Sequence, residues 1–258
     1  MIDALAIIGE NLFGASLDLD SHLSTLEALG VGGAVVAPAR GRDYRFDTAN
    51  DRLAAAVEGR AEVRWLARVD PNQADAAVAE LRRCIAAGAS GVYLDPDQDV
   101  FRVVDSRQVV TAAADSGLAS VIAAGAPLRA EPLQFDDLAQ SVPHARIVLT
   151  SGGQINISGL SMIDAWLALT RNPNLHVLSN GEYRQDYLER LANELDPERL
   201  LFASMAPLHD QRFELDRIRS ARFDASQREL IEHENAARLF AFAGGRSRDG
   251  AARLPGAE

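Results

Sequence analysis

Residues 29–38 read LGVGGAVVAP, and this stretch decides the fold class. A helical pattern ends at Gly30, and the chain then enters the nearly continuous apolar run of residues 33–37. An apolar run without alternation is typical of a strand covered on both faces, as in a parallel sheet beneath helices. The stretch therefore predicts a helix followed closely by a buried parallel strand.

The same succession of a short apolar run and a longer helical pattern occurs eight times along the chain. The strand candidates are residues 2–8, 32–38, 62–70, 91–96, 119–125, 145–152, 175–180 and 199–206. Helices are expected to begin near residues 18, 48, 70, 105, 131, 159 and 182, and a long helix is expected over residues 224–242.

This alternation, without a Gly-x-Gly-x-x-Gly motif after the first strand, predicts an α/β fold that is a single closed (β/α)8 TIM barrel over residues 1–243. A doubly wound single domain is the alternative. Residues 244–258 are rich in Gly, Arg, Asp and Ala and are predicted to form a flexible C-terminal tail.

Composition excludes several classes of function. The chain has 258 residues, 26 basic against 37 acidic side chains and a net charge of −11. Since the sequence contains no lysine, a Schiff-base lysine and a Walker-type phosphate loop are excluded. The sequence pI of about 5.0 argues against binding to nucleic acid or an anionic membrane. With Cys84 as the single cysteine and no apolar run of about 18 residues, we expect a cytoplasmic protein.

Six segments occur in the order and spacing of a known family. They are residues 2–9 (IDALAIIG), 29–38 (LGVGGAVVAP), 69–71 (VDP), 87–94 (AGASGVYL), 200–207 (LLFASMAP) and 233–240 (HENAARLF). Together they resemble the amidohydrolase superfamily, in its amidohydrolase-2 branch of aminocarboxymuconate-semialdehyde-decarboxylase-like proteins. The resemblance implies a TIM barrel and, in the family, a catalytic divalent metal and frequent pairing into dimers.

The sequence departs from this family at the metal site. The family's first strand reads Asp-x-His-x-His, and further ligands come from histidines on the fifth and sixth strands and an aspartate on the eighth. The corresponding positions carry side chains that are poor ligands for zinc or manganese, namely Leu5, Ile7, Ala123, Ser151 and Met205. No metal and no other cofactor is therefore expected.

Polar residues at the predicted strand ends are the candidates for a site, because function in these barrels lies where strands end and loops begin. Arg40, Arg68, Tyr93, Ser151 and Asn180 are predicted to bind substrate.

His209 and Asp95 are the candidates for acid/base catalysis. His209 is followed by an aspartate that could orient the imidazole, or it is an exposed loop histidine beside a helix-capping aspartate. Asp95 belongs to a carboxylate cluster for acid/base work or for a hard cation, or to an Asp-Pro turn that leaves a strand.

Two hypotheses follow. The first is a non-catalytic amidohydrolase-like protein, a pseudoenzyme or accessory subunit that forms a homodimer or a heteromer with a metal-bearing relative. The second is a metal-independent hydrolase, lyase or isomerase that acts on a small carboxylate or aromatic substrate at the barrel mouth. A plugged mouth favours the first hypothesis, and a deep polar cavity favours the second.

Overall fold

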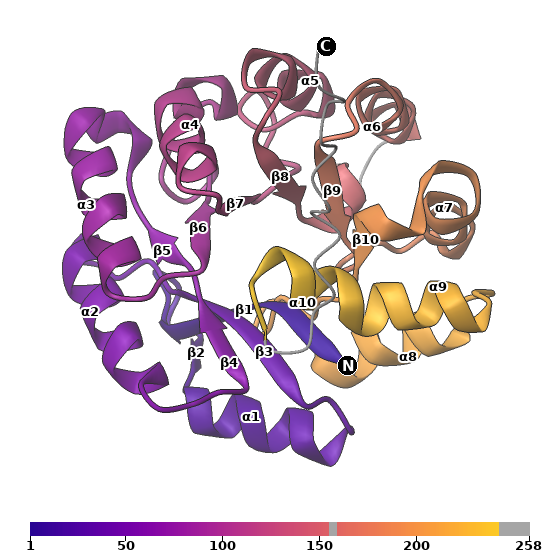
Figure 1. Ribbon diagram of the computed structural model, residues 1–258, viewed down its shortest axis with the longest axis horizontal. Coiled ribbons are helices and arrows are strands. Elements are labelled where there is room, and N and C mark those ends of the chain that lie inside the picture. Colours follow the sequence, from indigo (N-terminus) through magenta and orange to yellow (C-terminus); the bar gives the residue numbers. More distant parts are fainter. Residues whose placement is uncertain (155–158, 243–258) are drawn as a thin grey trace, which may run out of the picture.

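The computed structural model describes residues 1–154 and 159–242, and it confirms the predicted α/β barrel (Figure 1). Parallel strands fill eight positions, and two short strands share the third. In chain order they are β1 (Ile2–Glu10), β3 (Gly33–Pro38), β4 (Val63–Trp65) with β5 (Ala67–Arg68), β6 (Gly91–Leu94), β7 (Ala119–Ile122), β8 (Arg146–Leu149), β9 (Leu175–Leu178) and β10 (Leu200–Leu201). Each predicted strand segment overlaps one of these positions, and β1 extends two residues beyond its predicted end.

Backbone hydrogen bonds close the barrel at two seams. Leu66 lies between β4 and β5 and donates its N–H to the carbonyl of Val36 in β3 at 2.8 Å. Since β4 pairs with β3 and β5 pairs with β6, these two short strands together form the third strand of the barrel. At the other seam, the Ala4 N–H donates to Phe202 O at 2.9 Å and the Met205 N–H donates to Leu5 O at 2.7 Å. Because the last strand thus bonds to the first, the sheet is closed, and the doubly wound alternative is wrong.

The helices surround the strands in a ring, except the last one, which lies over one end of the barrel (Figure 1). They are α1 (Leu19–Ala28), α2 (Phe46–Val57), α3 (Asp75–Ala86), α4 (Arg107–Asp115), α5 (Pro132–Ser141), α6 (Gly159–Arg171), α7 (Gln185–Arg190), α8 (Gln211–Ser220), α9 (Ala225–Glu229) and α10 (Asn235–Leu239). A π-helical turn joins α9 to α10, so the predicted long helix is present but ends about three residues early. Two elements were not predicted: helix α8, and strand β2 (Ser16–Leu17), which pairs antiparallel with the end of β1.

The core has an inner and an outer part. The outer part lies between the strands and the helices, and the inner part fills the barrel with side chains such as Leu5, Val35, Val148 and Leu201. Side chains of α10, among them Leu239, and Phe240 directly after it belong to the inner part. This helix covers the amino-terminal ends of the strands, so the opposite end is left for a site.

In the described part of the chain, no helix is long and apolar enough to cross a membrane. The predicted flexible tail, residues 244–258, lies outside the described residues.

Candidate functional site

Four of the five residues predicted from the sequence to occupy metal-ligand positions of the family lie inside the barrel. Leu5, Ala123 and Met205 are buried members of the inner core, and Ile7 is half-buried and packs against it. Met205 adopts the left-handed conformation with φ +54°, which is uncommon for a residue other than glycine. The apolar side chains therefore gather where the strands end.

The fifth position, Ser151, is joined to this group by Asn180. The amide oxygen of Asn180 accepts the Ser151 N–H at 3.4 Å, and its amide nitrogen donates to the Met205 sulfur at 3.2 Å. Asn180 is completely buried, so both ends of its amide are used within the protein. Across residues 1–154 and 159–242, no three His, Cys, Asp or Glu side chains are grouped to hold a metal ion.

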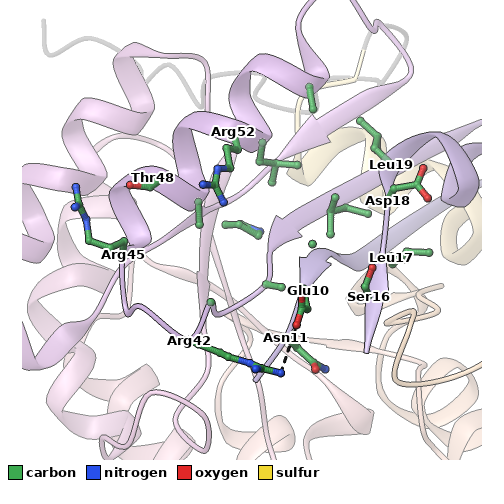
Figure 2. A pocket seen from close by; sticks show the side chains of 18 of the residues that line it. Glu10, Asn11, Ser16, Leu17, Asp18, Leu19, Arg42, Arg45, Thr48 and Arg52 are labelled. Atoms are coloured by element: carbon green, nitrogen blue, oxygen red, sulfur yellow. Dashed lines mark ion pairs between the residues drawn. The ribbon is translucent and has the colours of Figure 1, made fainter. Parts of the chain in front are cut away.

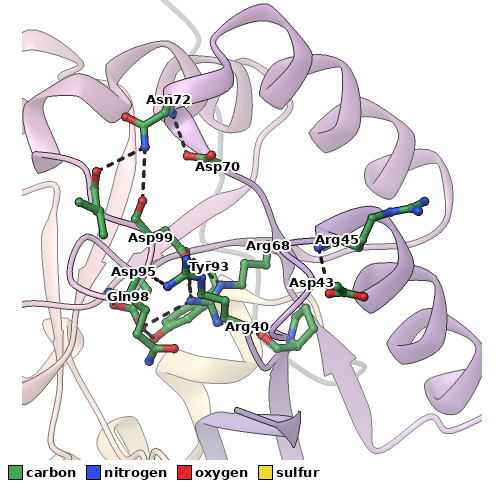
Figure 3. Close-up of polar contacts among 12 residues, drawn as sticks. Arg40, Asp43, Arg45, Arg68, Asp70, Asn72, Tyr93, Asp95, Gln98 and Asp99 are labelled. Carbon is green, nitrogen blue, oxygen red and sulfur yellow. Dashed lines mark hydrogen bonds and ion pairs between the residues drawn. The ribbon is translucent and has the colours of Figure 1, made fainter. Parts of the chain in front are cut away.

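Arg68 is the centre of a buried ion network at the ends of β3, β5 and β6 (Figure 3). Its guanidinium group contacts both carboxylate oxygens of Asp99, with Nε–Oδ2 at 3.1 Å and Nη2–Oδ1 at 3.0 Å. Asp95 Oδ2 lies 3.7 Å from Arg68 Nη2 and accepts the Tyr93 hydroxyl at 3.1 Å. Arg40 Nε lies 3.4 Å from Asp99 Oδ1. Two arginines and two aspartates thus offset one another's charge.

Burial dominates the electrostatics of this network. It raises the pKa of Asp99 to about 6, although Arg68 and Arg40 act to lower it. Burial, together with the charge of Asp95, also raises the pKa of Tyr93 well above its usual value. The Tyr93 hydroxyl therefore keeps its proton and remains a donor to Asp95.

Neighbouring groups hold both arginines in place. The Arg40 guanidinium carbon lies 3.5 Å from the ring centroid of Tyr44, and Arg40 also donates to the backbone oxygen of Gln98. Asn50 of α2 binds the backbone of Arg68 twice: its Oδ1 accepts the N–H and its Nδ2 donates to the carbonyl, each at 2.9 Å. The structure thus brings Arg40, Arg68, Tyr93 and Asp95 together, with their polar groups directed at one another.

A family profile described as Amidohydrolase matches residues 8–242. The chain belongs to the amidohydrolase family. This confirms the resemblance found in the sequence segments. No protein with a curated description matches the chain.

Solved structures share the fold of this amidohydrolase-family chain. One from Pseudomonas putida, described as a candidate 2-pyrone-4,6-dicarboxylic acid hydrolase, is 18% identical with a TM-score of 0.75 over 94% of this chain and 97% of that one. The 2,6-dihydroxybenzoate decarboxylase from Rhizobium is 17% identical with a TM-score of 0.74 over 95% and 100%. The 5-carboxyvanillate decarboxylase from Novosphingobium aromaticivorans, complexed with manganese and 4-hydroxy-3-methoxy-5-nitrobenzoic acid, is 12% identical with a TM-score of 0.75 over 93% and 95%.

The two acid/base candidates of this amidohydrolase-family barrel come from opposite sides of it. Asp95 follows β6 and, besides the Tyr93 hydroxyl, accepts the Gln98 N–H at 3.0 Å, so its carboxylate also holds the turn. His209 follows β10 and is half-buried, and burial together with Arg217 lowers its pKa. The next residue, Asp210, accepts the N–H of Phe213 at 3.0 Å and caps α8.

Glu182, after β9, is a buried acid at a position where the sequence pattern predicts only the start of a helix. Its Oε1 accepts the Arg184 N–H at 2.8 Å, and Gln154 donates to its Oε2. Gly152 has φ +62°, and a Cβ there would lie 3.0 Å from Glu182 Oε2, so glycine allows the close approach. Burial raises the pKa of Glu182 to about 7. The sequence signal that could have identified Glu182 as a site residue is its place directly after a predicted strand.

Proposed function

We propose that this protein is a non-catalytic member of the amidohydrolase family, which has lost the metal-binding residues and acts by binding a partner. The observation that carries the proposal is the set of side chains at the five ligand positions. Leu5 and Ala123 offer no lone pair, and the thioether of Met205 is too soft for zinc or manganese. Their burial adds to the barrel core instead of leaving a void.

The remaining donors near these positions do not complete a metal site. Asn180 is engaged by Ser151 and Met205, and a serine hydroxyl is a weak ligand. The mouth arginines Arg40 and Arg68 are neutralised by Asp95 and Asp99, so they are not free to hold a substrate carboxylate. This arrangement supports binding over catalysis.

Exposed apolar side chains support a partner at the end of the barrel where the strands finish. In the described part of the chain, the strongly exposed large apolar residues lie in loops after strands or in the first turn of the next helix, with Ile163 and Leu167 of α6 as the exceptions. The members of this set are Phe13, Tyr44, Val100, Leu128, Leu133, Tyr183, Leu208 and Phe213. Exposed apolar groups gathered on one face are typical of an interaction surface.

Within this set, Tyr183, Leu208 and Phe213 form what we call the β9–β10 patch. They are 61%, 68% and 62% exposed and belong to the neighbouring connections after β9 and β10. The N–H of Gly181 donates to Glu214 Oε1 at 3.2 Å and joins these two connections. We propose that this patch pairs the chain with a second barrel, either another copy or a metal-bearing relative.

Metal content and turnover test the loss of catalysis. After incubation with manganese or zinc and removal of unbound ions, the protein should retain far less than one ion per chain. It should not convert 2,6-dihydroxybenzoate or 5-carboxyvanillate, for which a decarboxylase of the family is the positive control. The double variant Leu5→His/Ile7→His should also remain inactive, because three positions would still lack a ligand. One tightly held ion per chain together with turnover would contradict the proposal.

Two measurements test whether the chain pairs with a second barrel. They are light scattering after size exclusion, and affinity purification from the native host followed by mass spectrometry. We expect a dimer or a complex with a related barrel. The double variant Leu208→Glu/Phe213→Glu should be a monomer that recovers no related barrel. Ile163→Glu, which places the same charge at an exposed apolar position of α6, should keep the partner. A monomeric wild-type protein that recovers no barrel would overturn the pairing.

A metal-independent enzyme acting on a small carboxylate or aromatic substrate is the second candidate. The observation that favours it is Glu182, a buried acid at the strand ends whose pKa of about 7 suits a general acid or base at neutral pH. His209→Ala and Asp95→Asn test the two acid/base residues named from the sequence. Metal-free turnover that Glu182→Gln abolishes in a folded protein would favour this candidate over the first.

A further inference from the structure

A cavity lies off the barrel axis, between the carboxyl ends of β1 and β3 and helices α1 and α2 (Figure 2). Its volume is about 610 Å³, within the range of roughly 300–1,000 Å³ typical of small-molecule sites. Its apolar lining includes Ile8, Leu17, Leu19, Pro38 and Leu53. None of the residues predicted for substrate binding or catalysis lines this cavity.

One charged side chain of the cavity is left without a partner. Arg52, on α2, is exposed and makes no hydrogen bond or ion pair with the described part of the chain. Figure 2 shows it pointing from α2 toward the cavity, with Thr48 one helical turn before it, whereas the guanidinium group of Arg45 points away. Arg45 is bound to Asp47, with Nη2–Oδ2 at 2.9 Å.

The other charged groups of the lining are engaged within the protein. Glu10 lies 3.4 Å from Arg42, from Oε1 to Nη2. Asp18 accepts the Ser21 N–H at 2.9 Å and caps α1, where the helix dipole offsets its charge. Asp43 accepts the N–H of Arg45 at 3.1 Å. The cavity thus combines an apolar lining with a single unpaired cation.

We propose that this cavity binds a small monoanion with an apolar body, specifically a monocarboxylate. A guanidinium group and a carboxylate match in a two-point hydrogen-bonded pair, so Arg52 would hold the carboxylate and the apolar lining would cover the body. A phosphate monoester carries a charge of about −1.5 to −2 and calls for more than one cation, which favours the carboxylate. The site goes beyond the proposed function, because it involves neither the barrel axis nor the β9–β10 patch.

Calorimetric titration with 4-phenylbutyrate tests the site, with the uncharged 4-phenylbutanol as the matched ligand. We expect one site per chain that prefers the acid at least tenfold. Arg52→Gln should weaken binding of the acid by roughly 10- to 100-fold, because a charge-assisted contact is lost. Arg82→Gln removes the same charge from an exposed position of α3 and should leave binding unchanged.

Ala49→Leu supplies a second test that leaves the charges intact. Ala49 lines the cavity, so the larger side chain should fill it and reduce binding of the acid and the alcohol alike. Circular dichroism checks that each variant is folded. The proposal is overturned if the wild-type protein does not bind 4-phenylbutyrate at millimolar concentration. It is also overturned if Arg52→Gln and Ala49→Leu bind as the wild-type protein does, since the ligand would then occupy another site.

Discussion

Replacement of Glu182 by glutamine should change how the stability of the protein depends on pH. Glu182 is fully buried, and burial raises its pKa from 4.5 to about 7. Between these values the folded protein keeps a proton that the unfolded chain releases. The stabilising contribution is therefore fully present below pH 4.5 and is lost as the pH rises through about 7.

The size of this effect follows from the two pKa values. One pH unit corresponds to about 1.4 kcal/mol, so the free energy of unfolding should lose about 3 kcal/mol across the window. Glutamine has a similar shape and cannot ionise, so Glu182→Gln lacks this loss. Asp3 and Asp99, whose pKa values burial raises to about 6, titrate in both proteins and cancel in the difference.

Urea denaturation of both proteins at several pH values between about 4 and 8 measures this difference. The stability of Glu182→Gln relative to the wild-type protein should rise by about 3 kcal/mol from the lowest to the highest pH. The constant cost of any altered hydrogen bond with Gln154 drops out of this comparison. A stability difference that is the same at every pH would refute the reasoning, because the pKa of Glu182 would then be the same in the folded and the unfolded protein.

Three further substitutions test individual contacts that hold the barrel together. Asn50→Ala leaves the backbone groups of Arg68 without their side-chain partner and should lower the free energy of unfolding by about 1–3 kcal/mol in urea. Gly91→Ala would place a Cβ 2.8 Å from a backbone oxygen of β7 and should cost about 1–3 kcal/mol by the same measure, whereas Gly32→Ala, which meets open space, should cost much less. Asp210→Ala removes the cap of α8 and should lower the thermal midpoint, at a cost of about 1 kcal/mol.

Most of the fold could be predicted because its signals are local. The eight strands are short apolar runs, and several helix ends follow from single residues: Asp70 accepts the N–H of Asn72, and Gly88 has φ +93° just beyond α3. Helix α8 was missed because its residues 211–220 are mostly polar. Leu215 and Ile218 are its only buried apolar residues, which is too few for a recognisable period.

The candidate site could be predicted only in part, because its contacts join distant segments. Strand ends predicted that Arg40, Arg68, Tyr93 and Asp95 would lie at the mouth of the barrel, and the structure joins them there in one ion network. The role of Asp99 depends on how a loop folds back, since it is 31 residues from Arg68 in the sequence. No local pattern shows which arginine such a loop will neutralise and which it will leave free.

Some arginines in the described part of this barrel are paired with aspartates and others are not, and this difference decides where an anion would bind at the lower cost. At the ends of β3 and β5, Arg40 and Arg68 are held by aspartates from the β6 loop, so binding an anion there would require breaking a buried ion pair. At the off-axis cavity, Arg52 has no pair to break. A carboxylate would therefore bind beside α2 at a lower cost than at the mouth. A barrel that does no chemistry on its axis, as proposed, could therefore still bind a ligand at this cavity, which also lies at the carboxyl ends of strands.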